Sequence, residues 1–162
     1  MKALSKKRIK VQEDMNVEFP VTESSAVDAC RCLEKFASSI SISRKTLFCL
    51  DHALAEYLQN LYDHSVAKTS KIDFQFSENK ITIVVRDDGL PYNVIEHPPV
   101  DTTLPLLDRP VGGLGIHLIR QLMDEVHYSS AGGWNSITLI KINSSEGSGF
   151  SQSTENKHSC EH

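Results

Sequence analysis

Three glycines stand directly before an amphipathic segment, in the sequence Arg109-Pro-Val-Gly-Gly-Leu-Gly115. Glycines at the mouth of a helix leave backbone N–H groups with no side chain in front of them, and the positive end of the helix dipole reinforces their attraction for an anion. Such a cluster suits a phosphate group. Glycines before a helix more often form a tight turn, because they relieve strained backbone. The cluster alone leaves both interpretations open.

A second polar set recurs on one predicted helix. Glu56 and Asn60 lie four residues apart and therefore on one face, and His64 follows one step further along. These residues either form a solvated surface or look into a cleft. In a cleft, the carboxylate could accept the proton of a hydroxyl group or of water. The neutral amide oxygen of Asn60 could bind Mg²⁺, which prefers oxygen ligands.

A pair of aspartates ends an apolar segment, in the sequence Asp87-Asp88-Gly89. Asp-Gly is a common turn signal, so one interpretation is a surface turn. In the other interpretation, a carboxylate at the strand end accepts a hydrogen bond from a ligand amino group. Gly89 would then allow the backbone to approach the ligand closely.

Alternating and helical periodicities predict the elements that position these residues. The predicted elements are a strand at 16–20, a helix from Thr22 or Ser24 to Ile40, a helix capped by Ser43 with leucines 47, 50, 54, 58 and 61 on one stripe, a hairpin at 72–85 that turns at 77–80, a helix after Gly115, and a hairpin of 126–129 with 137–142 that turns at 131–135. Because the strands come as adjacent pairs, we expect an α+β fold. It would be a two-layer sandwich of a mixed, mostly antiparallel sheet with helices on one face.

The composition limits the classes to which the protein can belong. The chain has 162 residues, is 40% hydrophobic and carries a net charge of −4, which suits one globular domain and argues against a general nucleic-acid binder. No apolar run approaches the ~20 residues that span a bilayer. The charged segment 1–13 is expected to be a mobile basic arm, 14–143 the folded domain and 144–162 a disordered tail. We expect a cytoplasmic protein without membrane contact.

A connection of more than 20 residues, rich in proline, separates Gly89 from the glycine cluster. Loops of this length in a compact domain are usually functional, and a lid is the expected role. The order of all these motifs resembles the N, G1 and G2 boxes of the ATPase superfamily shared by gyrase, the heat-shock chaperone, histidine kinases and mismatch-repair proteins (the Bergerat fold). Within it, the segments 84–92, 109–116 and 118–126 look like the anti-sigma-factor serine/threonine kinases. The resemblance covers residues 16–143.

The resemblance implies a role for each box residue. The glutamate of the N box, here Glu56, polarises the attacking hydroxyl group, and the asparagine, here Asn60, holds Mg²⁺. His64 matches a histidine common at the end of this box. The aspartate of the G1 box, here Asp87, reads the adenine amino group, with Gly89 beside the base.

At the phosphate end the same family implies that Gly113-Leu114-Gly115 cradles the phosphates of ATP. Gly112 would act as a hinge of the lid. Arg109 would contact a phosphate or the protein substrate.

Three functions follow from the resemblance. In the first, the protein is an ATP-dependent kinase that phosphorylates a small anti-sigma-factor antagonist and, when free, holds a sigma factor inactive; a homodimer is what the family suggests. In the second, nucleotide merely gates the docking of a partner protein and turnover is negligible. The third is a detached histidine-kinase catalytic domain. Tyr57, Gln59 and Tyr62 are bulkier than the residues usual in this box, which leaves the rate and the choice of partner open.

Overall fold

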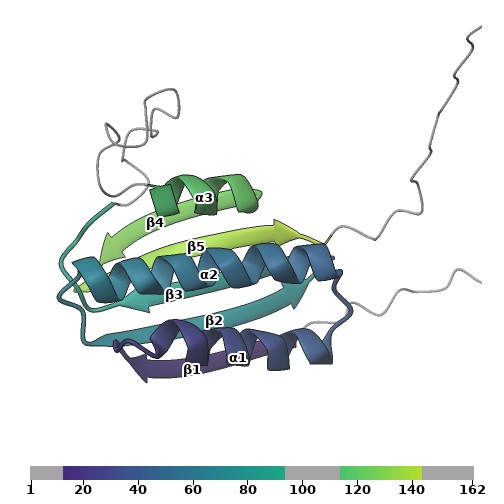
Figure 1. Cartoon of the computed structure of the whole chain (residues 1–162), viewed down its shortest axis with the longest axis horizontal. Helices are drawn as coiled ribbons and strands as arrows, with labels where there is room; N and C mark the ends of the chain where they lie inside the picture. Colours follow the sequence, from purple (N-terminus) through teal and green to yellow (C-terminus); the bar gives the residue numbers. More distant parts are fainter. Residues whose placement is uncertain (1–12, 94–113, 144–162) are drawn as a thin grey trace, which may run out of the picture.

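The part of the chain that the structure describes forms two layers, an open five-stranded sheet and three helices that cover one face of it (Figure 1). The computed structural model describes residues 13–93 and 114–143. The elements in chain order are β1 (Glu13–Pro20), α1 (Ser25–Ser39), α2 (Arg44–His64), β2 (Thr69–Ser77), β3 (Lys80–Asp87), α3 (Leu114–Leu122), β4 (Glu125–Ala131) and β5 (Trp134–Ile142).

The strand order is β1-β2-β3-β5-β4, and every pairing is antiparallel. The predicted α+β sandwich with helices on one face is therefore confirmed, and the sheet of the described residues is fully antiparallel rather than mixed. The strand β1 begins at Glu13, ahead of its predicted start. The Pro-rich connection, the basic arm up to residue 12 and the C-terminal tail lie outside the described residues.

Strand β3 decides which aspartate faces the helices. Its residues alternate, with Ile81, Ile83 and Val85 fully buried under the helical layer. Successive side chains on a strand point to opposite faces, so Asp87 continues the buried series and Asp88 does not. The carboxylate of Asp87 is thereby carried into the interior at the end of the strand, with 1% of the residue exposed.

Helix α2 is the central support of the helical layer. The Ser43 hydroxyl group accepts a hydrogen bond from the Thr46 amide at 3.1 Å, as the predicted N-cap requires. The predicted leucine stripe is confirmed: Leu47 is half-buried, and four leucines are buried, namely Leu50, Leu54, Leu58 and Leu61. Each buried leucine stabilises the fold by about 1.5–3 kcal/mol. The opposite side of the helix is thus held in a fixed orientation.

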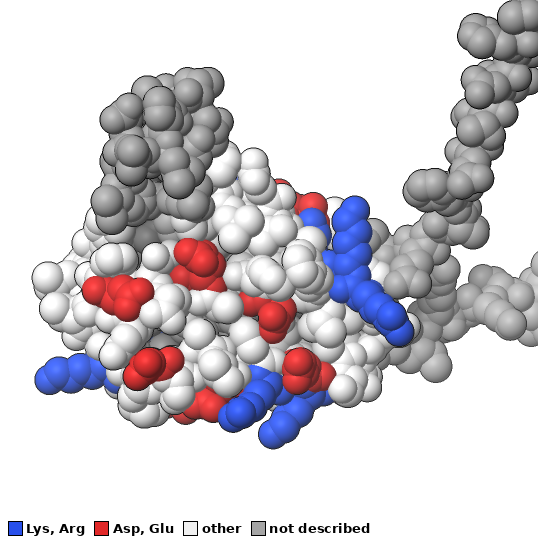
Figure 2. All heavy atoms as spheres, viewed as in Figure 1, with Lys and Arg blue, Asp and Glu red and all other residues white. Residues whose placement is uncertain are grey.

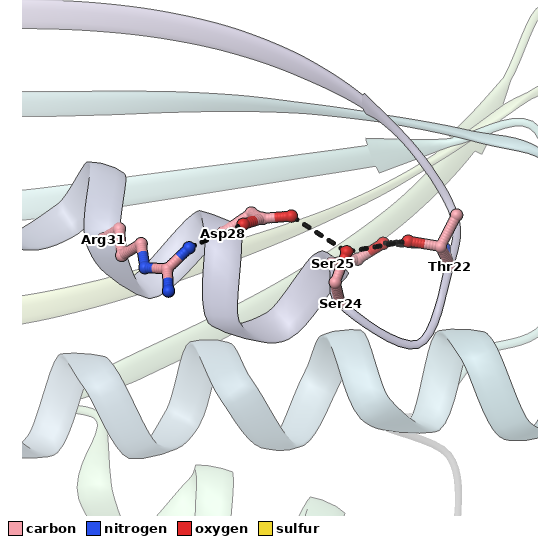
Figure 3. A network of polar contacts seen from close by, with 5 residues as sticks. All are labelled: Thr22, Ser24, Ser25, Asp28 and Arg31. Atoms are coloured by element: carbon pink, nitrogen blue, oxygen red, sulfur yellow. Dashed lines mark hydrogen bonds and ion pairs between the residues drawn. The ribbon is translucent and has the colours of Figure 1, made fainter.

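The start of α1 is held by hydrogen bonds among polar side chains (Figure 3). The Ser24 hydroxyl group donates to Asp28 at 2.9 Å, and Ser25 donates to the carbonyl of Pro20 at 2.9 Å. Ser24 occupies the N-cap position, although its side chain makes no capping hydrogen bond to the backbone. The helix start predicted at Thr22 or Ser24 is therefore confirmed at Ser24.

The two predicted hairpin turns are both present. Glu78 and Asn79 adopt positive φ angles of 53° and 65°, and Gly132 and Gly133 adopt 61° and 80°. Two successive residues with positive φ match the right-handed twist of the flanking strands. The second hairpin joins β4 to β5, and the other edge of β5 pairs with β3, which brings Asn135 opposite Asp87.

Among the described residues, no helix is long and apolar enough to cross a membrane.

Candidate functional site

The predicted site residues come from three elements. Glu56 and Asn60 are half-buried on α2, and His64 is the exposed last residue of that helix. Asp87 ends β3, and Gly115 lies in the first turn of α3. Leu114 begins α3, but its side chain lies outside the described residues, as do Arg109, Gly112 and Gly113 entirely.

The start of α3 packs directly against Glu56. A Cβ atom at Gly115 would lie 2.0 Å from Glu56 Oε1 and 2.8 Å from Glu56 Cγ, far inside van der Waals contact. Only a glycine lets the two helices approach this closely with the Glu56 side chain in its present position. The structure therefore brings together two residues that the sequence placed in separate motifs.

Glu56 also lines a pocket between α2 and α3. The pocket has a volume of about 330 Å³ and is lined by Glu56, Gly115, His117, Leu118 and Gln121. The Glu56 carboxylate makes no hydrogen bond or ion pair with any residue that the structure describes. As far as the described residues are concerned, it can accept a proton or a hydrogen bond from a group placed in this pocket.

Sequence reasoning missed the three side chains that α3 contributes to this pocket. A signal for two of them was present, since Gly115, Leu118 and Gln121 follow one another at three-residue steps and therefore share a face of α3. That face differs from the one formed by Ile116 and Ile119, which is buried in the core.

Asp87 lies at the centre of a buried hydrogen-bond network. Its Oδ1 atom accepts bonds from the Gly89 amide at 2.9 Å and from Asn135 Nδ2 at 3.0 Å. Its Oδ2 atom accepts a bond from the Tyr57 hydroxyl group at 3.2 Å. Burial, reinforced by the negative charge of Asp87, raises the pKa of Tyr57, so this hydroxyl group keeps its proton and acts as the donor.

Gly89 is held in close contact on two sides. A Cβ atom at this position would lie 2.5 Å from Ser65 Oγ and 2.8 Å from Asp87 Oδ1. The segment after β3 therefore runs tightly past the end of α2, and the absence of a side chain at Gly89 has a packing reason. The predicted approach of this backbone to a ligand stays a prediction.

The neighbouring Asp88 has a structural role. It is exposed, and its Oδ1 atom accepts hydrogen bonds from the backbone amides of Lys68 at 2.7 Å and Thr69 at 2.9 Å. The bond from Thr69, followed by that from Lys68, lowers the pKa of Asp88. The two adjacent carboxylates are thus separated, one facing the interior and one fixing the start of β2.

Asn60 could bind a metal ion only together with ligands that the described residues do not supply. Its half-buried side chain makes no hydrogen bond to a described residue, and the described residues contain no group of three or more His, Cys, Asp or Glu side chains that could hold an ion. Mg²⁺ commonly takes one or two protein oxygens together with substrate phosphates and water. A single amide oxygen fits that mode of binding.

Acidic side chains are scattered over the helical face of the described residues, while basic ones lie toward its margins (Figure 2). This face has no continuous basic stripe of the kind that follows a nucleic acid backbone.

Known proteins are similar to this chain in sequence and in fold. A serine/threonine-protein kinase, BtrW of Bordetella bronchiseptica, is 26% identical over 136 residues, which cover 80% of this chain and 94% of that protein. A serine-protein kinase, RsbW of Halalkalibacterium halodurans, is 32% identical over 87 residues, which cover 50% of this chain and 54% of that protein.

A crystal structure of the RsbU and RsbW domains of a Mycobacterium tuberculosis protein superposes with a TM-score of 0.59. At 15% identity it shares the fold, covering 80% of this chain and 32% of the longer one. The family model of the histidine kinase-like ATPase domain matches residues 19–141, which include α2, the end of β3 and the start of α3. This match confirms the superfamily expected from the three boxes. The chain belongs to the histidine kinase-like ATPase domain family.

Proposed function

We propose that this protein is an ATP-dependent serine/threonine kinase of the anti-sigma-factor type. Its substrate would be a small anti-sigma-factor antagonist, and the free kinase would hold a sigma factor inactive in the cytoplasm, as a homodimer. Membership of the ATPase domain family implies ATP binding, and the two relatives described above carry protein-kinase names. The observation that carries the proposal is the carboxylate of Glu56, which has no partner among the described residues and faces a pocket at the start of α3.

The base of ATP would bind at the end of β3. Asp87 would accept a hydrogen bond from the adenine amino group, and Gly89 would let the backbone lie against the ring. The buried setting of Asp87 supports this assignment, because a hydrogen bond away from water discriminates strongly against a ligand that lacks the donor.

The phosphates would lie at the start of α3, where backbone N–H groups and the helix dipole favour anions. We assign the cradle to Gly113, Leu114 and Gly115, with Gly112 as a hinge of the lid and Arg109 as a phosphate or substrate contact. Mg²⁺, when bound, would neutralise charge on the phosphate oxygens.

Asn60 would hold that ion through its amide oxygen. His64 would lie at the far end of the same face of α2, one turn beyond Asn60.

The transfer itself would take place beside Glu56. The serine or threonine oxygen forms a bond to the γ-phosphorus while the bond between that phosphorus and the ADP oxygen breaks. Glu56 would orient the hydroxyl group and accept its proton, which then passes to solvent. The pocket lined by His117, Leu118 and Gln121 offers room for the substrate segment on the side of Glu56 that α3 borders.

The proposal is tested by incubating the protein with labelled ATP, Mg²⁺ and candidate antagonist proteins. We expect acid-stable label on a serine or threonine of the antagonist. Glu56→Ala should lower the rate by at least about 100-fold, the lower range for a lost general base, while ATP binding persists. Glu34→Ala, which removes an exposed carboxylate on α1, is the matched control and should leave the rate unchanged.

Two other results would contradict the proposal, and each would favour a different function. Tight ATP-dependent complex formation without transfer would identify a nucleotide-gated binding module. Acid-labile label would indicate phosphohistidine and favour a detached histidine-kinase domain.

A further inference from the structure

The hydrogen bonds around Asp87 leave few acceptor positions on its carboxylate for a ligand. An ionised carboxylate has about four acceptor positions, two on each oxygen. Gly89 and Asn135 occupy both positions on Oδ1, and Tyr57 occupies one of the two on Oδ2. With respect to the described residues, one acceptor position on Oδ2 therefore remains, next to the Tyr57 hydroxyl group.

The orientation of the Asn135 amide is fixed by its surroundings. Its Nδ2 group faces three acceptors, namely Asp87 Oδ1 at 3.0 Å and the backbone carbonyls of Gly89 at 3.2 Å and Leu90 at 3.0 Å. Its Oδ1 atom accepts a bond from the Tyr128 hydroxyl group at 2.8 Å. A reversed amide would place an oxygen against these three acceptors, so only the present orientation satisfies the network.

Tyr128 extends this network to the segment that follows β3. Its hydroxyl group donates to Asn135 and accepts a bond from the Tyr92 amide at 3.0 Å. The chain from residue 87 to residue 92 is thereby attached to the β4–β5 hairpin at several points. The position of Asp87 and the path of the backbone beside it are held by the same side chains.

We propose that Tyr57 and Asn135 are positioning residues for base recognition, which hold the Asp87 carboxylate so that its single open acceptor position on Oδ2 meets the amino group of the base. This inference rests on the proposed function. It predicts that the preference for a purine with an amino group at carbon 6 depends on two side chains that the box residues did not include as ligand contacts, Tyr57 of α2, inside the N box, and Asn135 of β5, outside all three boxes.

The central test is Tyr57→Phe, which removes the hydroxyl group and keeps the buried ring. The measurement is the affinity of the full-length protein, by calorimetry, for ATP and for purine riboside triphosphate, which lacks the amino group. We expect ATP affinity to fall about 5-fold, on the order of one hydrogen bond, with the affinity for purine riboside triphosphate unchanged. Tyr62→Phe, at an exposed tyrosine of the same helix, is the matched control and should alter neither value.

Tyr128→Phe tests the Asn135 arm without removing Asn135 itself. Without the hydroxyl group Asn135 Oδ1 loses its donor and the side chain is held less firmly against Asp87, so the preference for ATP should again fall, by about 3-fold or more. Thermal unfolding of each variant reports its stability separately.

Three results are distinguishable. A smaller ratio of the two affinities in Tyr57→Phe and Tyr128→Phe supports the assignment. A wild-type protein that prefers ATP, with variants that keep the full preference or weaken both nucleotides equally, overturns the assignment and leaves the proposed function standing. A wild-type protein that binds neither nucleotide overturns the proposed function, and the assignment falls with it.

Discussion

At the scale of single residues, Gly115 and Glu56 lie in contact. In the proposed reaction Gly115 would bind the phosphates and Glu56 would orient the attacking hydroxyl group. The glycine suits the backbone approach to phosphate, and its lack of a side chain also leaves room for the glutamate. The same residue thus has a packing reason that is independent of any ligand.

Gly115→Ala should separate catalysis from stability. The new methyl group would displace the flexible Glu56 side chain, and we expect the transfer rate to fall at least about 10-fold, because catalysis depends on positioning the reacting groups. The melting temperature should change little, since the ~1 kcal/mol advantage of alanine over glycine in a helix interior is smaller in the first turn, where Gly115 lies.

A double mutant shows whether this effect acts through Glu56. In a Glu56→Ala background, Gly115→Ala should cause little further loss of rate. An undiminished rate in the single variant would show that this contact does not position Glu56.

At the scale of elements, the two aspartates at the end of β3 have different roles. Strand alternation directs Asp87 toward α2 and leaves Asp88 on the outside, where it joins the end of β3 to the start of β2. The residue next to Asp87 thus fixes the junction between the end of β3 and the start of β2.

Asp88→Ala should loosen this junction in a pH-dependent way. The pKa of Asp88 is lowered from its ordinary value of 3.8, so its carboxylate stabilises the fold above that value and ceases to do so as pH falls through the lower, folded-state pKa. We expect a loss of about 1 kcal/mol at pH 7, given the solvent exposure of the group.

Unfolding in urea across pH 2 to 7 measures the difference between wild type and Asp88→Ala. The difference should shrink as pH falls below the ordinary pKa of 3.8 and through the lowered, folded-state pKa. A constant difference across this range would mean that the charge of Asp88 is not the source of the stabilisation.

At the scale of the whole molecule, one core fixes the distances among the site's elements. The leucine stripe of α2 packs with Ile83 and Val85 of β3 and with Ile119 of α3 in a single cluster. Displacement of α2 relative to the sheet would therefore move Glu56 and Asn60 away from Asp87.

Leu54→Ala tests how strongly this core holds the fold. Leu54 is fully buried, and its truncation should destabilise the protein by about 2–5 kcal/mol through lost burial and the cavity left behind. Urea unfolding measures this loss, and Leu47→Ala, at the half-buried end of the same stripe, should cost clearly less. Equal losses for the two variants would contradict the packing described here.

Much of this protein follows from its sequence alone. Period-two and helical spacing predicted the strands, the leucine stripe and the turns, because these patterns reflect which side of an element is buried. The order of Glu56, Asn60, Asp87 and the glycine cluster indicated the ATPase superfamily, which the family match confirms.

Only the tertiary structure brought distant residues together. Asn135 lies 48 positions from Asp87, and strand register alone places it opposite. The contact of Gly115 with Glu56 likewise depends on how α3 packs against α2. Local propensity carries no information about such long-range contacts, because they are fixed by strand pairing and by the packing of whole faces.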